Sequence, residues 1–561
     1  MNKTLLIGVL MAVPSTLMAQ SALDAYSISQ NDLRGSARFM SMGGAFTALG
    51  GDISTLNQNP GGIGVYRSSD LAATLDITMN STKFLGGNGS QKANHTRVAC
   101  NNFGYIGTVN LGSSSVMPFF NWGASYSRVA SFDRRYRGEY GSIASSLTEM
   151  VANMTNTDKI APSEMSTADM NKYNPYLDGS AQWMSTLMFT GAAINPVSPN
   201  SNTYTGLFDP QRSSGIASAV MDEKGYVDEY SINFGGNISD IVYWGIGFGI
   251  TDLDFRQKAY YSENVYDANV TNGSDAGTVK GDAYYTLGNY KHIWGSGFNF
   301  KAGVIIKPIN EFRLGIAVHT PTYYNLSYEG SGQLSYQYES PSYINDKGES
   351  FNLRGDAYTD GGYLREFDWK CRTPWRLMVG AAGVIGGRAI ISADYEYRAT
   401  NDIKLQDYDG YDLDNENSDI KTYYKATNIM RLGAEYRVTP QFSVRAGYVY
   451  ETSPVTTEAM DGYVRNGNAN DAVFMYTAGN DETETQPSYS LDKQTTYVTC
   501  GMGYRYKNFY ADLAYVHRHR SSKLKAFSNF NELDTNEFVM SPSAKLTDDN
   551  NSIVLTLGFR F

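Results

Sequence analysis

Residues 551–561 of the chain read NSIVLTLGFRF, and this short stretch decides the class of fold. Large apolar residues occupy every second position from Ile553 to Phe561. The positions between them, from Val554 to Arg560, carry smaller or polar residues. Because residues i and i+2 of a β-strand lie on the same side, the segment is predicted to be a strand with one apolar face and one small or polar face.

The same two-sided pattern recurs along the chain after residue 70. Clear examples are 312–318, 375–381, 391–397, 430–436 and 442–450. A soluble β-sandwich also alternates in this way, so alternation alone leaves two architectures open.

Strand length and loop length separate the two architectures. Many of the alternating runs exceed the ~5–6 residues that are usual in soluble sheets. Short turns at 308–310, 386–388, 439–441 and 507–508 alternate with long polar loops at 336–361, 409–421, 457–491 and 529–550. Short turns on one side and long loops on the other are typical of bacterial outer-membrane barrels.

The pattern therefore predicts an all-β transmembrane fold, a 14-stranded antiparallel outer-membrane β-barrel over residues 70–561. The predicted strands are 70–85, 101–112, 117–135, 227–237, 242–261, 282–307, 311–335, 362–385, 389–407, 422–438, 442–455, 492–506, 509–527 and 551–561. An even number of strands places both ends of the barrel on the short-turn side, which is the periplasmic side.

Composition and the N-terminus agree with an exported protein. Its 43 Tyr and 55 Gly suit strands and tight turns better than helices. Residues 1–19 have the layout of a secretory signal peptide, with Lys3 in a short basic region before an apolar one.

The net charge of the chain excludes one class of partner. Removing Lys3 with the signal peptide changes the net charge from −11 to −12, and such a negative charge argues against nucleic acid as a partner. No later run of about 18 apolar residues predicts a spanning helix.

The three cysteines do not form a disulfide framework, since they are few and odd in number. In the predicted register, Cys371 and Cys500 face lipid on non-adjacent strands, and Cys100 lies in the first outer loop. We expect no disulfide, no bound metal and no cofactor.

Residues 136–226 interrupt the alternation and form a predicted extracellular insertion with short helices. Leu147, Met150 and Met154 follow helical spacing, as do Trp183 and Leu187. The two apolar faces either form a small loop core or line a methionine-rich groove that captures apolar ligands. The loop core is the preferred interpretation, because most amphipathic stripes bury against their own protein.

The segment before the first strand carries a resemblance to a known family. Residues 20–69 contain Gly43, Gly44, Asn59 and Pro60 in an order that resembles the N-terminal hatch of the FadL/TodX family of hydrophobic-compound transporters. The family usually has Ala where this chain has Gly61. A hairpin over residues 295–324 also resembles the family, and the final Phe561 resembles the signal that the barrel-assembly machinery reads.

The resemblance implies a barrel whose hatch plugs the lumen. Ligands would be caught in an outer groove, pass to a lumenal pocket and leave sideways through a kinked third strand, with passive uptake of long-chain fatty acids or hydrocarbons. Gly123, on the lumen side of that strand, either permits the kink or makes room for the hatch. The helical insertion follows strand three, whereas family members carry their capture helices on later loops.

The charged residues of the predicted lumen allow two interpretations. Arg376, Arg431 and Arg445 either bind a fatty-acid carboxylate or pair with Asp394, Glu396, Glu435 and the hatch. Pairing is preferred, because charges inside a barrel need partners. His517 and His519 share a strand face, but two histidines without a third ligand make a poor metal site. The acidic stretch 407–419 either binds Ca²⁺ or bridges sugars, or consists of solvated turns, which explain its composition as well.

Two functions remain open at this level. The first is the transport channel, which is not an enzyme and whose partners are outer-membrane lipid, lipopolysaccharide and a hydrophobic ligand. The second is a non-transport barrel that acts as a docking or structural subunit of an outer-membrane complex for secretion or surface-protein assembly. The large insertion and the long loops motivate the second, whose partners are other outer-membrane proteins or lipoproteins.

Overall fold

The computed structural model describes most of residues 21–561. The positions outside the description are 1–20, 88, 113, 199–200, 272–277, 345–349, 463–482 and 533–536. The predicted signal peptide, residues 1–19, therefore lies outside the described residues.

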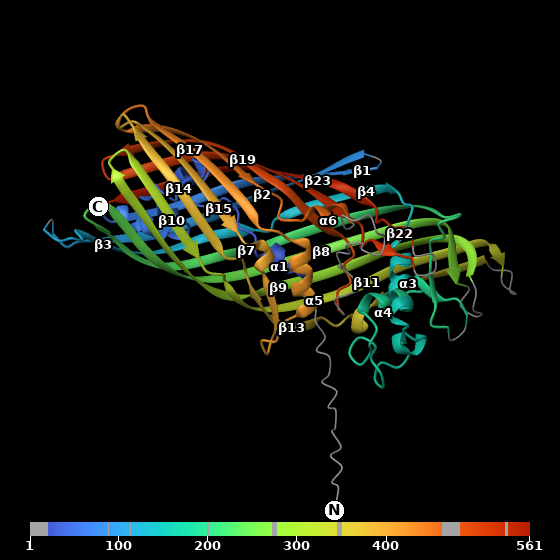
Figure 1. Ribbon diagram of the computed structural model, residues 1–561. Coiled ribbons are helices and arrows are strands. Elements are labelled where there is room, and N and C mark those ends of the chain that lie inside the picture. The colour runs from blue at the N-terminus through green and yellow to red at the C-terminus, as the bar shows by residue number, and fades with distance from the viewer. Residues whose placement is uncertain are drawn as a thin grey trace, which may run out of the picture.

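The described strands form one closed antiparallel barrel (Figure 1). β1 (Asp70–Gly86) pairs with β2 (Gly89–Asn110) on one edge and with β23 (Ser543–Arg560) on the other, which closes the sheet. The predicted count of 14 strands is confirmed, although several strands are broken into two or three pieces. Between β2 and β23 they are, in order, β3 (Phe119–Ser131) with β4 (Arg134–Ser142), β7 (Ser214–Ile238), β8 (Val242–Thr271), β9 (Thr278–Ile309), β10 (Phe312–His319) with β11 (Tyr323–Ile344), β12 (Ser350–Tyr358) with β13 (Arg365–Arg372) and β14 (Arg376–Ile385), β15 (Ala389–Arg398) with β16 (Lys404–Asp407), β17 (Thr427–Arg437), β18 (Phe442–Glu451), β19 (Tyr489–Tyr506) and β20 (Phe509–Lys525).

The alternation read from the C-terminal strand is confirmed. Leu555 is 41% and Leu557 58% exposed on the outer surface, whereas Val554 and Thr556 between them are buried. Exposed apolar side chains continue on the neighbouring strands and form the lipid-facing belt of a transmembrane barrel.

The barrel is much taller on one side than the bilayer requires. β8 contains 30 residues and β9 contains 32, whereas about 9–11 residues of a tilted strand cross a bilayer. These strands project beyond the membrane together with α3 (Leu147–Asp158) and α4 (Trp183–Thr190) (Figure 1). No helix within the described residues is long and apolar enough to cross a membrane.

Short elements complete the described fold. They are η3 (Pro162–Met165), β5 (Ile194–Pro196), β6 (Tyr204–Gly206), η4 (Thr359–Gly362), η5 (Thr400–Asp402), α5 (Asp414–Tyr423), α6 (Thr457–Asp461), β21 (Phe530–Asn531) and β22 (Phe538–Val539). Helix α5 occupies part of the acidic stretch 407–419, for which solvated turns were one interpretation.

The predicted boundaries of the first outer loop and of the helical insertion are both wrong, because the strands extend further than their apolar alternation indicates. Cys100 lies within β2 and not in an outer loop, because β1 extends to Gly86 and β2 already begins at Gly89. The insertion after strand three is also shorter than 136–226, since β4 runs to Ser142 and β7 starts at Ser214. Strands that project beyond the membrane face water on their outer side, so their sequences lose the apolar alternation.

The predicted lipid-facing position of Cys371 is wrong, since its side chain is 2% exposed and points inward. Val318 and Tyr323 both face outward although they are an odd number of residues apart, so the alternation inverts between β10 and β11. The neighbouring strand is also broken at this height, between β13 and β14. Thr322 N donates to Thr373 Oγ1 (2.8 Å) and so joins the two breaks. Cys500 is exposed as predicted, and all three cysteines are free.

Residues 21–69 fill the lumen, and we call them the plug. The plug contains α1 (Ala22–Ile28), α2 (Ala37–Ser41), η1 (Ile53–Asn57) and η2 (Pro60–Val65). η2 contacts β3, β7, β8 and β9, while α2 contacts β18, β19, β20 and β23 on the opposite wall. The plug therefore spans the barrel from one wall to the other (Figure 1).

Asn59 fixes the plug to the barrel wall. Its Oδ1 accepts from Gly61 N (2.9 Å), and its Nδ2 donates to Thr47 O (2.6 Å). A Cβ at Gly303 would overlap Asn59 Oδ1, and a Cβ at Gly245 would overlap the carbonyl of Pro60. The wall thus lacks side chains where the plug backbone touches it.

The glycine pair Gly43 and Gly44 has a conformational role as well. Both residues have positive φ angles, +63° and +69°, which glycine adopts without strain. The turn they form lets the chain after α2 reach the wall, where Gly43 lies against the backbone of Leu432 and Tyr448.

Candidate site: a lumenal cavity behind a lateral seam

The barrel wall contains a stretch without backbone pairing between β2 and the broken third strand. β2 pairs with β3 only from Asn102 (opposite Ser127) to Asn110 (opposite Phe119). Among the described strand pairings, the rest of β2 pairs only with β1, and β4 pairs only with β7. One backbone hydrogen bond beyond these ladders joins the β1–β2 turn to β4, from Gly87 N to Tyr140 O (3.0 Å). We call this stretch, between residues 97–101 of β2 and residues 128–134, the seam.

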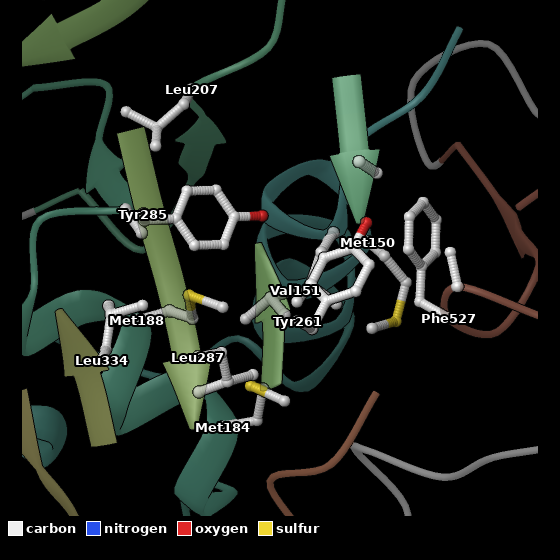
Figure 2. Close-up of a cluster of buried hydrophobic side chains, with 14 of the residues drawn as sticks. Met150, Val151, Met184, Met188, Leu207, Tyr261, Tyr285, Leu287, Leu334 and Phe527 are labelled. Carbon is white, nitrogen blue, oxygen red and sulfur yellow. The ribbon is translucent and has the colours of Figure 1, made fainter. Parts of the chain in front are cut away.

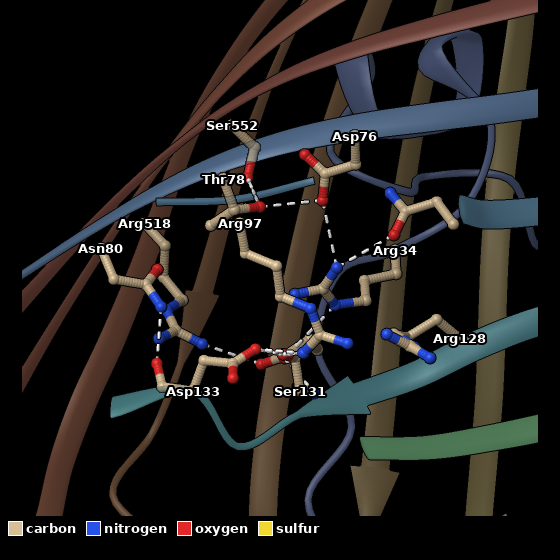
Figure 3. Close-up of polar contacts among 12 residues, drawn as sticks. Arg34, Asp76, Thr78, Asn80, Arg97, Arg128, Ser131, Asp133, Arg518 and Ser552 are labelled. Atoms are coloured by element: carbon tan, nitrogen blue, oxygen red, sulfur yellow. Dashed lines mark hydrogen bonds and ion pairs between the residues drawn. The ribbon is translucent and has the colours of Figure 1, made fainter. Parts of the chain in front are cut away.

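Side chains close the seam (Figure 3). Arg97 Nη1 donates to Ser131 Oγ (3.0 Å) and also pairs with Asp133, in the break between β3 and β4. Asn80 Nδ2 donates to the carbonyl oxygen of Asp133 (2.5 Å). The wall is thus held at this point by a few polar side chains and not by a ladder of backbone hydrogen bonds.

The plug is tied to the seam from the inside. Ser131 N donates to Asp32 Oδ2 (3.2 Å), and Asp32 N donates to Val129 O (3.0 Å). Arg34 Nη1 donates to Asp76 Oδ2 (3.1 Å). Movement of residues 32–34 would therefore break or strain the hydrogen bonds to Val129 and Ser131 at the seam.

Asp32 is held as a charged group. Arg518 Nη1 donates to its Oδ1 at 2.8 Å. Burial acts to raise the pKa of Asp32, but Arg518, Arg34 and Arg520 outweigh it, so the pKa lies below its ordinary value. The contact between the plug and the wall is therefore an ionic one.

A first cavity of about 1050 Å³ lies directly behind the seam. Its wall includes residues 130–134 at the seam and Asp32 of the plug. Lys291 lies between Asp24 Oδ2 (3.0 Å) and Glu484 Oε2 (2.6 Å) at this cavity. These contacts join helix α1, strand β9 and the outer loop before β19 in one network.

A second cavity of about 1070 Å³ lies on the other side of plug residues 28–35. Three guanidinium groups at its edge share one carboxylate, Glu396: Arg376 at 2.7 Å, Arg398 at 3.1 Å and Arg431 at 2.6 Å. Arg431 Nη1 and Arg398 Nε are buried and have no hydrogen-bond acceptor among the described residues. Asp394 and Glu451 also interact with Arg431, and Glu451 with Arg398, so the arginines are not short of negative charge. The two unpaired donor atoms are what this wall offers to an anionic group.

The structure places the three arginines of the sequence prediction in ion pairs. Arg376 and Arg431 bind Glu396, as stated above, and Arg445 binds Glu435 and Asp512, each at 2.6 Å. Arg38 of the plug also binds Glu435 (2.9 Å). Asp394, however, accepts from the plug backbone at Thr47 N (2.8 Å).

Gly123 makes room for the plug. It pairs with Ile106 on one side and Asn233 on the other, so the strand is regular at this position. A Cβ at Gly123 would lie 3.3 Å from Leu56 Cδ1 of the plug. The break in strand three comes later, at Phe132 and Asp133. Of the two roles open for Gly123, room for the plug fits its regular pairing and a kink at that glycine does not.

The helical insertion forms a closed apolar core (Figure 2). Leu147, Met150, Trp183 and Leu187 are at most 4% exposed, and Met154 packs at the edge of the cluster. Figure 2 shows helix residues against strand residues Tyr261, Tyr285 and Leu334. A capture groove at these residues stays a prediction, and in this structure their side chains fill the space between one another.

The two histidines of strand β20 have polar partners. His517 Nδ1 lies 3.0 Å from Asn551 Oδ1, and His519 Nδ1 lies 2.7 Å from Asp549 Oδ1. The described residues contain no group of three or more His, Cys, Asp or Glu side chains that could hold a metal ion.

Sequence reasoning missed the residues that form the seam. Arg97 lies in a stretch that we expected to be a loop, and Asp133 lies near the predicted end of strand three at residue 135. The only local signal was the run Asp133-Arg134-Arg135, because three charged residues in succession do not fit an alternating strand.

No family model matches the chain, and no curated protein matches it in sequence. Among solved structures, a FadL homologue from Pseudomonas aeruginosa is 13% identical, with 95% of this chain and 99% of that chain covered and a TM-score of 0.48. The toluene transporter TodX of P. putida is 14% identical, with 94% and 99% covered and a TM-score of 0.44. The toluene transporter TbuX of Ralstonia pickettii is 13% identical, with 94% and 99% covered and a TM-score of 0.39.

Proposed function

We propose that this protein is an outer-membrane channel for the passive uptake of hydrophobic small molecules. In this proposal the plug controls the lumen, and the seam between β2 and the β3–β4 break is a lateral exit into the bilayer. The observation that carries it is the seam itself, which has a cavity directly behind it and is bonded to plug residues 32–34.

A lateral exit suits an apolar ligand because the ligand does not have to cross water. Each backbone hydrogen bond of a strand ladder contributes about 0.5–1.5 kcal/mol, and a paired strand has many of them. A single partly exposed ion pair such as Arg97–Asp133 contributes at most about 1 kcal/mol. Opening the wall at the seam therefore costs less than opening a stretch that a backbone ladder holds together.

The second cavity favours an amphipathic ligand with an anionic end. Arg431 and Arg398 both bind Glu396, and each presents an unpaired donor atom at this cavity. A fatty-acid carboxylate can accept from such guanidinium groups in bidentate fashion. We therefore infer a preference for long-chain fatty acids over uncharged hydrocarbons such as toluene.

Uptake measurements test this function. A strain lacking the gene is complemented with the wild-type protein, and the entry of a labelled long-chain fatty acid and of labelled toluene is measured. We expect faster fatty-acid entry than in the uncomplemented strain, with a smaller effect on toluene. Equal rates in both strains for both compounds would remove the basis of the proposal.

The alternative function, a docking subunit of an outer-membrane complex, is favoured by one observation. β8 and β9 project far beyond the bilayer and carry a packed helical body, which is more than a channel of this kind requires. Purification in mild detergent tests this alternative, because a docking subunit is expected to copurify with a stoichiometric partner. A protein that runs alone on a sizing column under those conditions contradicts it.

A further inference from the structure

Arginines gather at the periplasmic mouth of the lumen. Strand ends next to the short turns carry five of them: Arg313, Arg437, Arg445, Arg505 and Arg560. Their strand neighbours Leu314, Tyr436, Val444, Tyr504 and Leu557 are exposed on the lipid-facing side. Because side chains alternate along a strand, the arginines point into the lumen and not toward the lipid headgroups outside.

These arginines line a cavity of about 1590 Å³, which we call the vestibule. Arg38 and Arg67 of the plug also line it, whereas the acidic residues in its lining are only Asp52, Glu435 and Asp512. The excess of cations is local, because the whole chain has a net charge of −11.

Four of the arginines have carboxylate partners. Arg38 and Arg445 bind Glu435, Arg560 binds Asp70, and Arg67 binds Asp240. Asp52 of the lining takes part in none of these pairs and accepts instead from Ser36 Oγ (2.8 Å) and Ser54 N (2.9 Å) within the plug.

Three arginines remain without an ion pair among the described residues: Arg313, Arg437 and Arg505. Arg313 Nη1 donates to the carbonyl oxygen of Leu49 (2.8 Å), but its buried Nε has no acceptor in that part of the chain. Arg437 and Arg505 are exposed to solvent, and Arg313 is half-buried. Guanidinium groups without counter-ions around one open cavity repel one another, so an anion that binds among them is stabilised.

Arg437 and Arg505 are arranged as a clamp. Arg437 is paired with Ser443 on the next strand, and Ser443 is paired with Gly503 on the strand after that. Arg505 lies two residues beyond Gly503 and therefore points to the same side. Two strand spacings and an offset of two residues along the strand separate their Cα atoms by about 12 Å. The carboxylate of Asp512 and the guanidinium group of Arg445 lie over Gly503, beside this space.

We propose that the vestibule is a binding site for an anionic carboxylate or phosphate group, held by Arg437 and Arg505, with Arg313 elsewhere in the same lining. The site opens to the periplasm, and plug residues Gly50, Gly51 and Asp52 form part of its wall. A bound anion would therefore contact the plug from its periplasmic side. This proposal is independent of transport through the seam.

Direct binding measurements test the site. The full-length barrel is purified in an uncharged detergent, and calorimetry measures the binding of inorganic phosphate and of dodecyl phosphate. Binding of both with similar affinity identifies a free anion as the ligand, and binding of dodecyl phosphate alone identifies the headgroup of an amphiphile. Wild-type protein that binds neither probe overturns the proposal.

Variants locate the binding. The double substitution Arg437→Gln and Arg505→Gln is expected to weaken binding about ten-fold or more, the equivalent of about 1.4 kcal/mol. Arg388→Gln is the matched control, since Arg388 is an exposed arginine in a periplasmic turn outside the vestibule lining. Heat-modifiable migration on a gel shows that each variant is folded. A folded double variant with wild-type affinity also overturns the proposal.

Discussion

Arg97 of β2 reaches across an unpaired part of the barrel wall and pairs with Asp133, in the break between β3 and β4. This ion pair joins two strands that no backbone hydrogen bond connects at that height. Ser131, which also accepts from Arg97, donates its backbone N–H to Asp32 of the plug. The closure of the wall and the position of the plug thus depend on the same few atoms.

Removal of the Arg97 side chain is expected to loosen the seam. The substitution Arg97→Gln breaks the contacts to Ser131 and Asp133, so an apolar fluorescent probe should enter cells or liposomes faster than with wild type. Stability should fall by at most about 1 kcal/mol, because the pair is partly exposed. The control Arg135→Gln removes the Arg135–Asp222 pair (3.0 Å) between strands that are already fully paired. Equal entry rates for the two variants would contradict a role of the seam in transport.

The contact between Asn59 and Gly303 is expected to determine the position of the plug. Gly303→Ala places a methyl group on Asn59 Oδ1 and displaces Asn59 from its hydrogen bonds. Each buried polar group left unsatisfied costs about 1–3 kcal/mol, so the plug should shift and ion conductance across planar bilayers should increase. Gly383→Ala is the control, because a Cβ there meets its nearest atom only at 3.9 Å. Conductance equal to that of the control would show that the plug tolerates the displacement.

Arg431 is expected to distinguish charged ligands from uncharged ones. Its Nη1 is unpaired at the second cavity, while its Nη2 binds Glu396. Arg431→Gln should weaken the binding of decanoate to the purified barrel about ten-fold, since a charge-assisted hydrogen bond contributes about 1.5–3 kcal/mol, and should leave toluene binding unchanged. An equal loss for both ligands would indicate a general distortion of the cavity.

Helix α3 is expected to be more stable in mild acid than at alkaline pH. Burial raises the pKa of Glu149 to about 8, with the nearby Glu263 adding to the effect. The unfolded segment loses this proton near its ordinary pKa of 4.5, so between these two values the folded state binds more protons and its stability falls as pH rises. Above about pH 8 the contribution is lost.

Hydrogen exchange over residues 147–158 measures this dependence after correction for the intrinsic exchange rate. Protection should decrease from pH 5 to pH 8 in the wild type, and Glu149→Gln should reduce that slope. Glu164→Gln is the control, because Glu164 accepts from Ala161 N (2.9 Å) in the same insertion at the start of a separate turn. A wild-type profile without a slope would contradict the buried, protonated state of Glu149.

Much of the barrel could be predicted from the sequence because its two faces meet different solvents. Lipid requires apolar side chains such as Leu555 and Leu557, and the lumen accepts Thr556 and Gly558, so a period of two identifies the strand and its outer face. The same argument failed for residues 89–100, where both faces are polar. It failed again at Cys371, because paired breaks at Pro321 and Pro374 invert the alternation.

The functional arrangement depends on contacts that no local pattern encodes. Arg97 meets Asp133, and Asp32 meets Arg518, only because the plug and the strands pack in one register. The clamp of Arg437 and Arg505 likewise follows from the pairing of three strands across Ser443 and Gly503.

The sequence by itself determined the strand number, the lipid-facing side and the presence of a small-residue segment before the barrel, since each follows from local periodicity and composition. The tertiary structure alone decided where the wall lacks backbone pairing and which charges line the same cavity. Those features depend on distances between residues far apart in the chain, and such distances are set by the register and closure of the whole barrel.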